Sequence, residues 1–135
     1  MQVVVPIDAE AALAEDIAEY WQHPAYPTPL PDDFADDLPC ALVTEVGGHG
    51  ETMVTDEHDL SIDVYAGTYA EAMDEARKVA AIVASIWHAA PSSGRQWLTS
   101  GVNAMPYANP DPSNYSVPRV STTVIATIRG TIVNL

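Results

Sequence analysis

Histidines and carboxylates are the side chains of this 135-residue chain that could do acid–base or metal chemistry: it has four His and 19 Asp or Glu. His49 and His58, with Asp56 and Asp59 nearby, would be enough ligands for a metal site. Their spacing matches no zinc motif, and the glycines beside His49 would not hold a ligand in place. We therefore interpret both histidines as solvent-exposed turn residues. Among 19 acids, Asp/Glu pairs arise by chance, so none marks a catalytic dyad.

A glycine-rich stretch and a single cysteine are the other candidates for chemistry. Gly47–Gly50 holds three glycines, but no P-loop Lys follows it and its spacing is not that of a dinucleotide-binding loop. Glu45 and Glu51 would repel a phosphate there, so we predict a hairpin turn. Cys40 stands in a strand-like run, which favours a small buried side chain over a nucleophile. The residues alone thus locate no catalytic group and no metal site, and an enzyme is possible but unsupported.

The charge of the chain is strongly negative and unevenly distributed. The formal net charge is −14, and 18 of the 19 acids precede the first base. The five bases are Arg77, Lys78, Arg95, Arg119 and Arg129. Phosphate neutralisation needs clustered Lys and Arg, so the composition argues against binding to nucleic acid and against binding to an anionic membrane. It favours an oligomer in which an acidic half meets a less acidic half, or a surface that must not hold DNA. The first ten residues lack the basic and apolar regions of a signal peptide, so we expect synthesis in the cytoplasm.

The stretch from Leu60 to Ala90 should organise the fold. Residues 60–66 alternate apolar and polar side chains, which predicts a half-buried strand. Thr68 then stands three residues before Glu71, the spacing of a helix capping box. Apolar residues from Tyr69 to Trp87 recur every three or four positions and predict a core helix of about five turns.

The remaining elements are one amphipathic helix and three strands. We expect the helix from its cap at Asp8 to Trp21, and the strands at residues 38–46, 96–104 and 119–133. Trp97 should anchor the strand that contains it, and Gly101 should mark either a bulge or a close approach of another segment. The order is helix, strand, strand, helix, strand, strand. We therefore predict one α+β domain over residues 1–135, with a single antiparallel or mixed sheet of about four strands and the helices packed on one face.

Two proline-rich segments, at about residues 24–39 and 105–118, are predicted to be long surface loops, because dense prolines exclude helix and central strand. Phe34, the only Phe, should pin the first loop either to the body or to a neighbouring subunit. The loops, the hairpin tip and two bases supply the predicted contact residues. These are Phe34, Asp36, Asp37, Gly48, His49, Arg77, Asn109, Asp111, Tyr115 and Arg119.

Three stretches together carry a resemblance to a known family. LPCALVTEVGG precedes an acidic turn, SIDVYA runs directly into the helix TYAEAMDEARKVAAIV, and ANPDPSNYSVPRVSTTVIATIRG combines Asn-Pro-Asp and Tyr with a final β-branched strand. From about Leu38 to Val133 the chain resembles the tail terminator (tail completion) proteins of long-tailed phages, siphoviruses, notably those of actinobacterial hosts. No single motif is diagnostic; the order of elements carries the similarity.

This resemblance implies a structural virion protein at the head-proximal end of the tail, and not an enzyme. Such subunits form a hexameric ring that caps the tube of the major tail protein, stops its polymerisation and joins the tail to the head-completion (stopper) protein of the neck. The resemblance implies no cofactor and no membrane, and DNA passes through the ring without specific binding. Acids of residues 32–59 around the channel would repel the genome, and Arg77, Lys78 or Arg119 would meet acids of the next subunit.

Two alternatives stay open. One is another head–tail connector or minor capsid protein of the neck in the same kind of virion. The other is a small cellular enzyme or ligand-binding domain on a similar α+β scaffold, which a pocket with convergent polar groups would favour.

Overall fold

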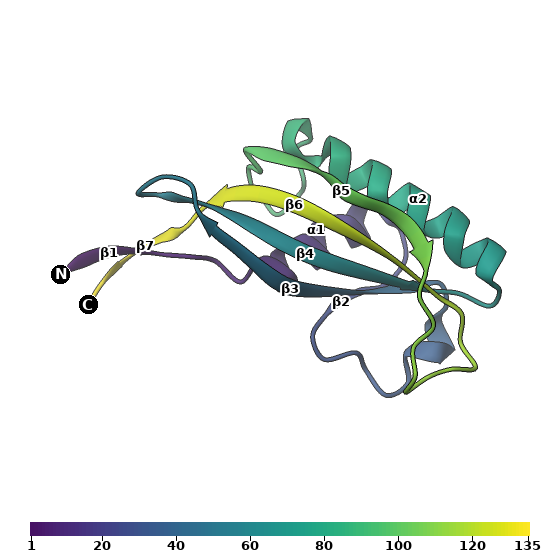
Figure 1. The fold of residues 1–135 in the computed structure, drawn as a ribbon. Coiled ribbons are helices and arrows are strands. Elements are labelled where there is room, and N and C mark those ends of the chain that lie inside the picture. The colour runs from purple at the N-terminus through teal and green to yellow at the C-terminus, as the bar shows by residue number, and fades with distance from the viewer.

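The computed structural model describes all residues from 1 to 135 and has two α-helices, two short 3₁₀ helices and seven strands. A twisted five-stranded sheet carries both α-helices on one face and leaves the other face without helices (Figure 1). A second, two-stranded sheet joins the two termini. The predicted α+β class is confirmed. The structure has two sheets, of five and two strands, where a single sheet of about four strands was predicted.

The large sheet has the strand order β2-β3-β4-β6-β5, in which only the β2–β3 pair is parallel. The strands are β2 (Ala25–Pro27), β3 (Cys40–Gly50), β4 (Thr55–Tyr65), β5 (Thr99–Ala108) and β6 (Arg119–Arg129). β2 lies inside the first proline-rich segment, where a loop was expected. Its prolines are tolerated because β2 is an edge strand, whose outer N–H groups have no partner to lose. β5 likewise extends four residues into the second expected loop, which shortens that loop to residues 109–118.

The helices begin where the capping residues predicted. α1 (Ala9–Trp21) starts after Asp8, whose carboxylate accepts from the backbone N–H of Ala11 at 3.1 Å. α2 (Tyr69–Ser85) starts after Thr68, whose hydroxyl accepts from the backbone N–H of Glu71 at 3.1 Å. A 3₁₀ turn, Ile86–His88, ends it. Neither helix is long and apolar enough to cross a lipid bilayer.

The core fills the space between the helices and one face of the sheet. α1 packs on β2 and β3, and α2 packs on β5 and β6. Leu60, Ile62 and Val64 point inward from β4, as the alternation predicted, and each is fully buried. Burial of such a side chain is worth about 1.5–3 kcal/mol. Tyr69 and Trp87 were expected in the apolar stripe of α2, but both are more than 40% exposed because they flank the helix at its two ends.

The glycine-rich segment is not the predicted turn. Gly47–Gly50 continue β3, and the turn lies at residues 51–54. Gly48 has φ +133°, and a Cβ there would lie 2.2 Å from the carbonyl oxygen of Glu57, so glycine is required by a close strand contact. The bulge that was one of the two expectations for Gly101 is also displaced: the irregularities of β5 lie between Val102 and Ala104 and between Ala104 and Tyr107.

The predicted final strand is two strands, broken at Gly130. A Cβ on Gly130 would lie 2.6 Å from the carbonyl oxygen of Val5, so the two termini approach each other here. Beyond this point β7 (Thr131–Asn134) pairs antiparallel with β1 (Gln2–Val5), a strand that was not predicted. The resulting β1–β7 ribbon projects beyond the body of the subunit (Figure 1).

Candidate functional site

The two proline-rich loops meet at one end of the helix-free face of the sheet. Phe34, in the 3₁₀ turn Phe34–Asp37, is 4% exposed, and its ring centroid lies 4.8 Å from that of Tyr65. Cys40 completes this buried cluster, and Val117 of the second loop packs against it. Cys40 is buried, as predicted. Phe34 therefore pins the first loop to the body of its own subunit, the first of the two alternatives given above.

A polar network around Asp111 holds the second loop in place. The Asp111 carboxylate accepts hydrogen bonds from the Tyr65 hydroxyl at 2.9 Å and from the Asn114 side-chain amide at 3.1 Å. The Arg119 guanidinium lies 3.8 Å from that carboxylate and donates to the Asn109 carbonyl oxygen at 2.6 Å. Three of the predicted contact residues thus bind one another within the subunit, where they fix the shape of the loop.

The ionisation of this network follows from its contacts. Burial, together with the hydrogen bond to Asp111, raises the pKa of Tyr65. Burial alone would raise the pKa of Asp111, but hydrogen bonds from Asn114 and Tyr65 outweigh it and lower that pKa. At neutral pH the loop is therefore held by a carboxylate that accepts from a protonated phenol. Tyr115, by contrast, is 78% exposed near the end of the same loop and available to a partner.

Beyond the loops, the row of β4 side chains on the helix-free face is polar and acidic. Because side chains alternate along a strand, those of β4 that do not enter the core share this face. Hydroxyl-bearing residues of β6 lie opposite them in the strand register. Asp63 accepts from Ser121 at 2.5 Å and lies 4.0 Å from the Arg119 guanidinium. The other side chains of this row are Glu57, Asp59, Ser61 and Thr123.

The β3–β4 hairpin carries the one cluster of three side chains that could hold a metal ion. His49, Glu51 and Glu57 each place a ligand atom within 4.8 Å of the others. The His49 Nε2 atom lies 3.1 Å from Glu51 and 4.0 Å from Glu57. A hydrogen bond to Glu51 raises the pKa of Glu57. The side chains of His49 and Glu51 are exposed, so the cluster offers oxygen and nitrogen ligands to a divalent cation without a buried site to select one.

The structure separates His58 from His49. His58 is 4% exposed, and its Nδ1 atom contacts the Glu45 carboxylate, whereas its Nε2 atom is buried without a hydrogen-bond partner. The interpretation of His58 as a solvent-exposed turn residue is therefore wrong. His58 lies two residues before Leu60, so its side chain points to the same, helix-covered face as the core residues of β4.

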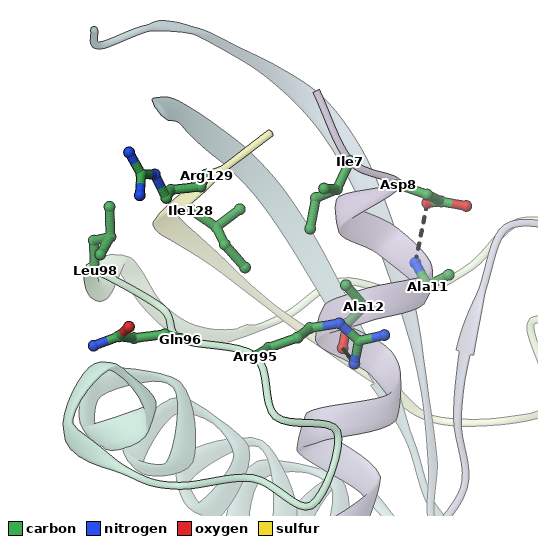
Figure 2. Close-up of a pocket in the computed structure, with 9 residues that line it drawn as sticks. All are labelled: Ile7, Asp8, Ala11, Ala12, Arg95, Gln96, Leu98, Ile128 and Arg129. Atoms are coloured by element: carbon green, nitrogen blue, oxygen red, sulfur yellow. Dashed lines mark hydrogen bonds between the residues drawn. The ribbon is translucent and has the colours of Figure 1, made fainter. Parts of the chain in front are cut away.

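The largest pocket lies between the start of α1 and the segment that leads into β5, with a volume of about 490 Å³ (Figure 2). Its apolar walls come from α1, from the end of β6 and from Leu98. Figure 2 shows Arg95 reaching α1 beside Ala12, whereas the guanidinium of Arg129 points away from that helix. Arg95 is already paired with Asp16 at 3.1 Å and with Glu15 at 3.4 Å, so the pocket does not offer two free guanidinium groups to a ligand.

A buried carboxylate ties this segment to α1. Asp16 has no exposed surface and accepts from the Trp97 indole N–H at 2.8 Å, the Ser93 hydroxyl at 2.7 Å and the Arg95 guanidinium at 3.1 Å. Trp97 is buried, as its predicted role as an anchor requires, although it precedes β5 instead of lying in it. The entry to the edge strand β5 is therefore fixed by one side chain of α1.

The predicted contact residues fall in three places. Phe34, Asn109, Asp111 and Arg119 gather at the loop-covered end of the sheet, and Asp36, Asp37 and Tyr115 are exposed around them. Gly48 and His49 lie near the opposite end, on β3. Arg77 lies apart from both groups, on α2, where it is 3.3 Å from Asp74.

Two functional features were missed from the sequence. One is the β1–β7 ribbon, whose strands lie at opposite ends of the chain; the uncharged runs QVVV and TIVN were its only signal. The other is Arg129, the one base of the five without an ion-pair or hydrogen-bond partner in the subunit. Nothing in the sequence distinguished it from the other arginines.

Comparison with models of known protein families and with curated proteins finds no match for this chain. The structure is an α+β fold with a helix-covered face, a helix-free face that carries an acidic row on β4, and a projecting uncharged ribbon.

Proposed function

We propose that this chain is a structural subunit of a phage tail, a tail terminator whose copies form a ring, with six the expected number. The ring caps the tail tube, stops its polymerisation and presents a surface to the head-completion protein of the neck. DNA passes through the ring without specific binding. The family resemblance of residues 38–133 motivates this function, and the division of the surface supports it.

The observation that carries the proposal is that the helix-free face and the ribbon differ in chemistry. The helix-free face displays Glu57, Asp59 and Asp63 in one row of β4, and Asp36 and Asp37 are exposed on the loop that covers its end. A face of this kind repels the phosphates of DNA, which suits the wall of a channel. The ribbon end instead exposes uncharged apolar side chains, which suit a contact with protein.

Light scattering combined with negative-stain imaging of the purified protein tests the assembly. We expect a ring, or a concentration-dependent transition from monomer to ring. When the protein is added to polymerising tube protein, the tubes should stop growing and carry a ring at one end. A strictly monomeric protein that never binds tail tubes would refute the proposal.

The location of the protein in the virion separates a terminator from another neck protein. Gold-labelled antibody should mark the junction of tail tube and neck. Label confined to the portal would instead assign the chain to a head-side connector.

A further inference from the structure

The β1–β7 ribbon has too little of its own structure to account for its stability. Each strand has four residues, and the pair makes at most marginal contact with any other helix or strand. Val5 is 40% exposed and Ile132 is 63% exposed. A two-stranded ribbon is marginally stable alone in water and needs a third strand or a packing surface. Both of its outer backbone edges are free to supply one.

The free edge of β5 is the surface in the same chain that can receive a strand. The outer strands of the large sheet are β2 and β5, and β3 is also unpaired on one side beyond Val43, where β2 ends. That part of β3 is a poor receptor because the Glu45 N–H already donates to the Glu10 carboxylate and the strand is irregular between Glu45 and Gly47. β2 has three residues and ends in Pro27, so it is too short to extend the sheet. β5 begins with four residues in regular register, Thr99–Val102, before its first irregularity. This stretch equals the ribbon strands in length, about 13 Å at 3.3 Å per residue.

Charge favours this pairing over other contacts between two copies. Each copy carries a net charge of −14, so most of its surfaces repel each other. The sequences of β1, β7 and β5 contain no charged side chain. Arg129, two residues before β7, has no ion-pair partner in its own chain, so its positive charge beside the ribbon reduces the repulsion by a second acidic copy.

We propose that the ribbon of one copy adds to the free edge of β5, along Thr99–Val102, in a second copy of the chain. Main-chain hydrogen bonds join the two sheets, as in other cases of strand addition. The donor and receptor surfaces are different, so the contact is head-to-tail and generates a ring when the rotation closes. This inference rests on the proposed ring and identifies the surfaces that form it.

Cross-linking between two variants that each carry one added cysteine tests the contact directly. Ile132→Cys and Thr99→Cys proteins are purified separately, mixed and treated with a short bismaleimide. Cys40 is fully buried, so the native thiol does not react. We expect a covalent dimer of twice 14.5 kDa from the mixture. The control replaces Ile132→Cys by Met53→Cys, which is 95% exposed at the hairpin turn and should give at least tenfold less product.

A charge substitution tests the same contact by light scattering. Ile132→Asp should shift the ring to monomers, whereas Met53→Asp, with the same change of charge, should leave it intact. Circular dichroism of both variants checks that the fold is retained. Equal cross-linking in the control, or an intact Ile132→Asp ring, would overturn the ribbon contact while the ring stands. A native protein that is monomeric and does not cap tubes would overturn the proposed function and this inference with it.

Discussion

Replacement of Asp16 by Ala should destabilise the subunit more than any single change at its surface. The substitution removes the acceptor of three hydrogen bonds, from Trp97, Ser93 and Arg95. The Trp97 indole is 1% exposed and cannot turn to water once its acceptor is gone. The Arg95 side chain is 28% exposed and can be hydrated, so its share of the loss is smaller.

The magnitude follows from these environments. A hydrogen bond to a charged acceptor contributes about 1.5–3 kcal/mol, and removal of one partner from a buried charged pair costs about 3–5 kcal/mol. If the hydrogen bond of the buried indole counts in full and those of the other two donors count in part, Asp16→Ala should lower the free energy of unfolding by about 3–4 kcal/mol. Asp16→Asn keeps an acceptor oxygen and should lose about half of this.

Urea unfolding followed by far-UV circular dichroism measures the loss. Glu15→Ala is the matched control, because Glu15 also contacts Arg95, at 3.4 Å, but its side chain is 63% exposed. It should change the free energy of unfolding by less than about 0.5 kcal/mol. A loss below about 1 kcal/mol for Asp16→Ala, or equal losses for both variants, would show that the buried acceptor is unimportant.

Three further outcomes follow from single groups. Gly48→Ala forces a Cβ to within 2.2 Å of the Glu57 carbonyl oxygen at positive φ, so urea unfolding should show a destabilisation of about 1–3 kcal/mol. The control is Gly101→Ala, whose Cβ would meet no atom within 4 Å and which should cost less than about 0.5 kcal/mol. Burial raises the pKa of Cys40 to about 11, so a thiol reagent at pH 8 should label it only after unfolding; labelling at the rate of a free thiol would contradict its burial. Hydrogen bonds that outweigh burial lower the pKa of Asp111, so its contribution to stability is present above its unfolded pKa of about 4 and is lost as the pH falls through the lower folded value. Urea titrations from pH 7 to pH 3 should show a decline that is smaller in Asp111→Asn, and equal declines would contradict this.

Local signals in the sequence were sufficient for the helices and the central strand. Asp8 and Thr68 were identified as caps because a side-chain oxygen before an apolar helical pattern satisfies free backbone N–H groups. The alternation of residues 60–66 identified the core face of β4 because its opposite face stays polar. In both cases the information lies within one turn or one strand, where periodicity reports burial directly.

Pairings between distant segments could not be predicted in this way. Gly47–Gly50 have the composition of a turn, yet they form a strand because the close approach of β4 requires glycine at position 48. β1 pairs with β7 from the other end of the chain, so neither short run shows its partner. The same limit applies to the candidate site. Tyr115 was predicted as a contact residue and is exposed, but the network that joins Asp111 to Arg119 depends on how the loops pack.

The response of the proposed ring to salt separates two ways of joining its subunits. Contacts between Arg119 and acids of the next copy, as the sequence predicted, would weaken as salt screens opposite charges. In the structure Arg119 is already held by Asp63 and Asp111, and a new partner would have to displace them. A ribbon contact instead joins uncharged strands of two bodies that each carry −14, so it needs no ion pair.

Salt should therefore strengthen the ribbon contact, because screening reduces the repulsion between the bodies and leaves main-chain hydrogen bonds almost unchanged. The screening length falls from about 30 Å at 0.01 M salt to about 10 Å at 0.1 M, which is short against the size of the subunit. Light scattering across this range should show the monomer-to-ring midpoint move to lower protein concentration as salt rises. A midpoint that moves to higher concentration would mean that opposite charges hold the subunits together, and that the ribbon is not the main contact.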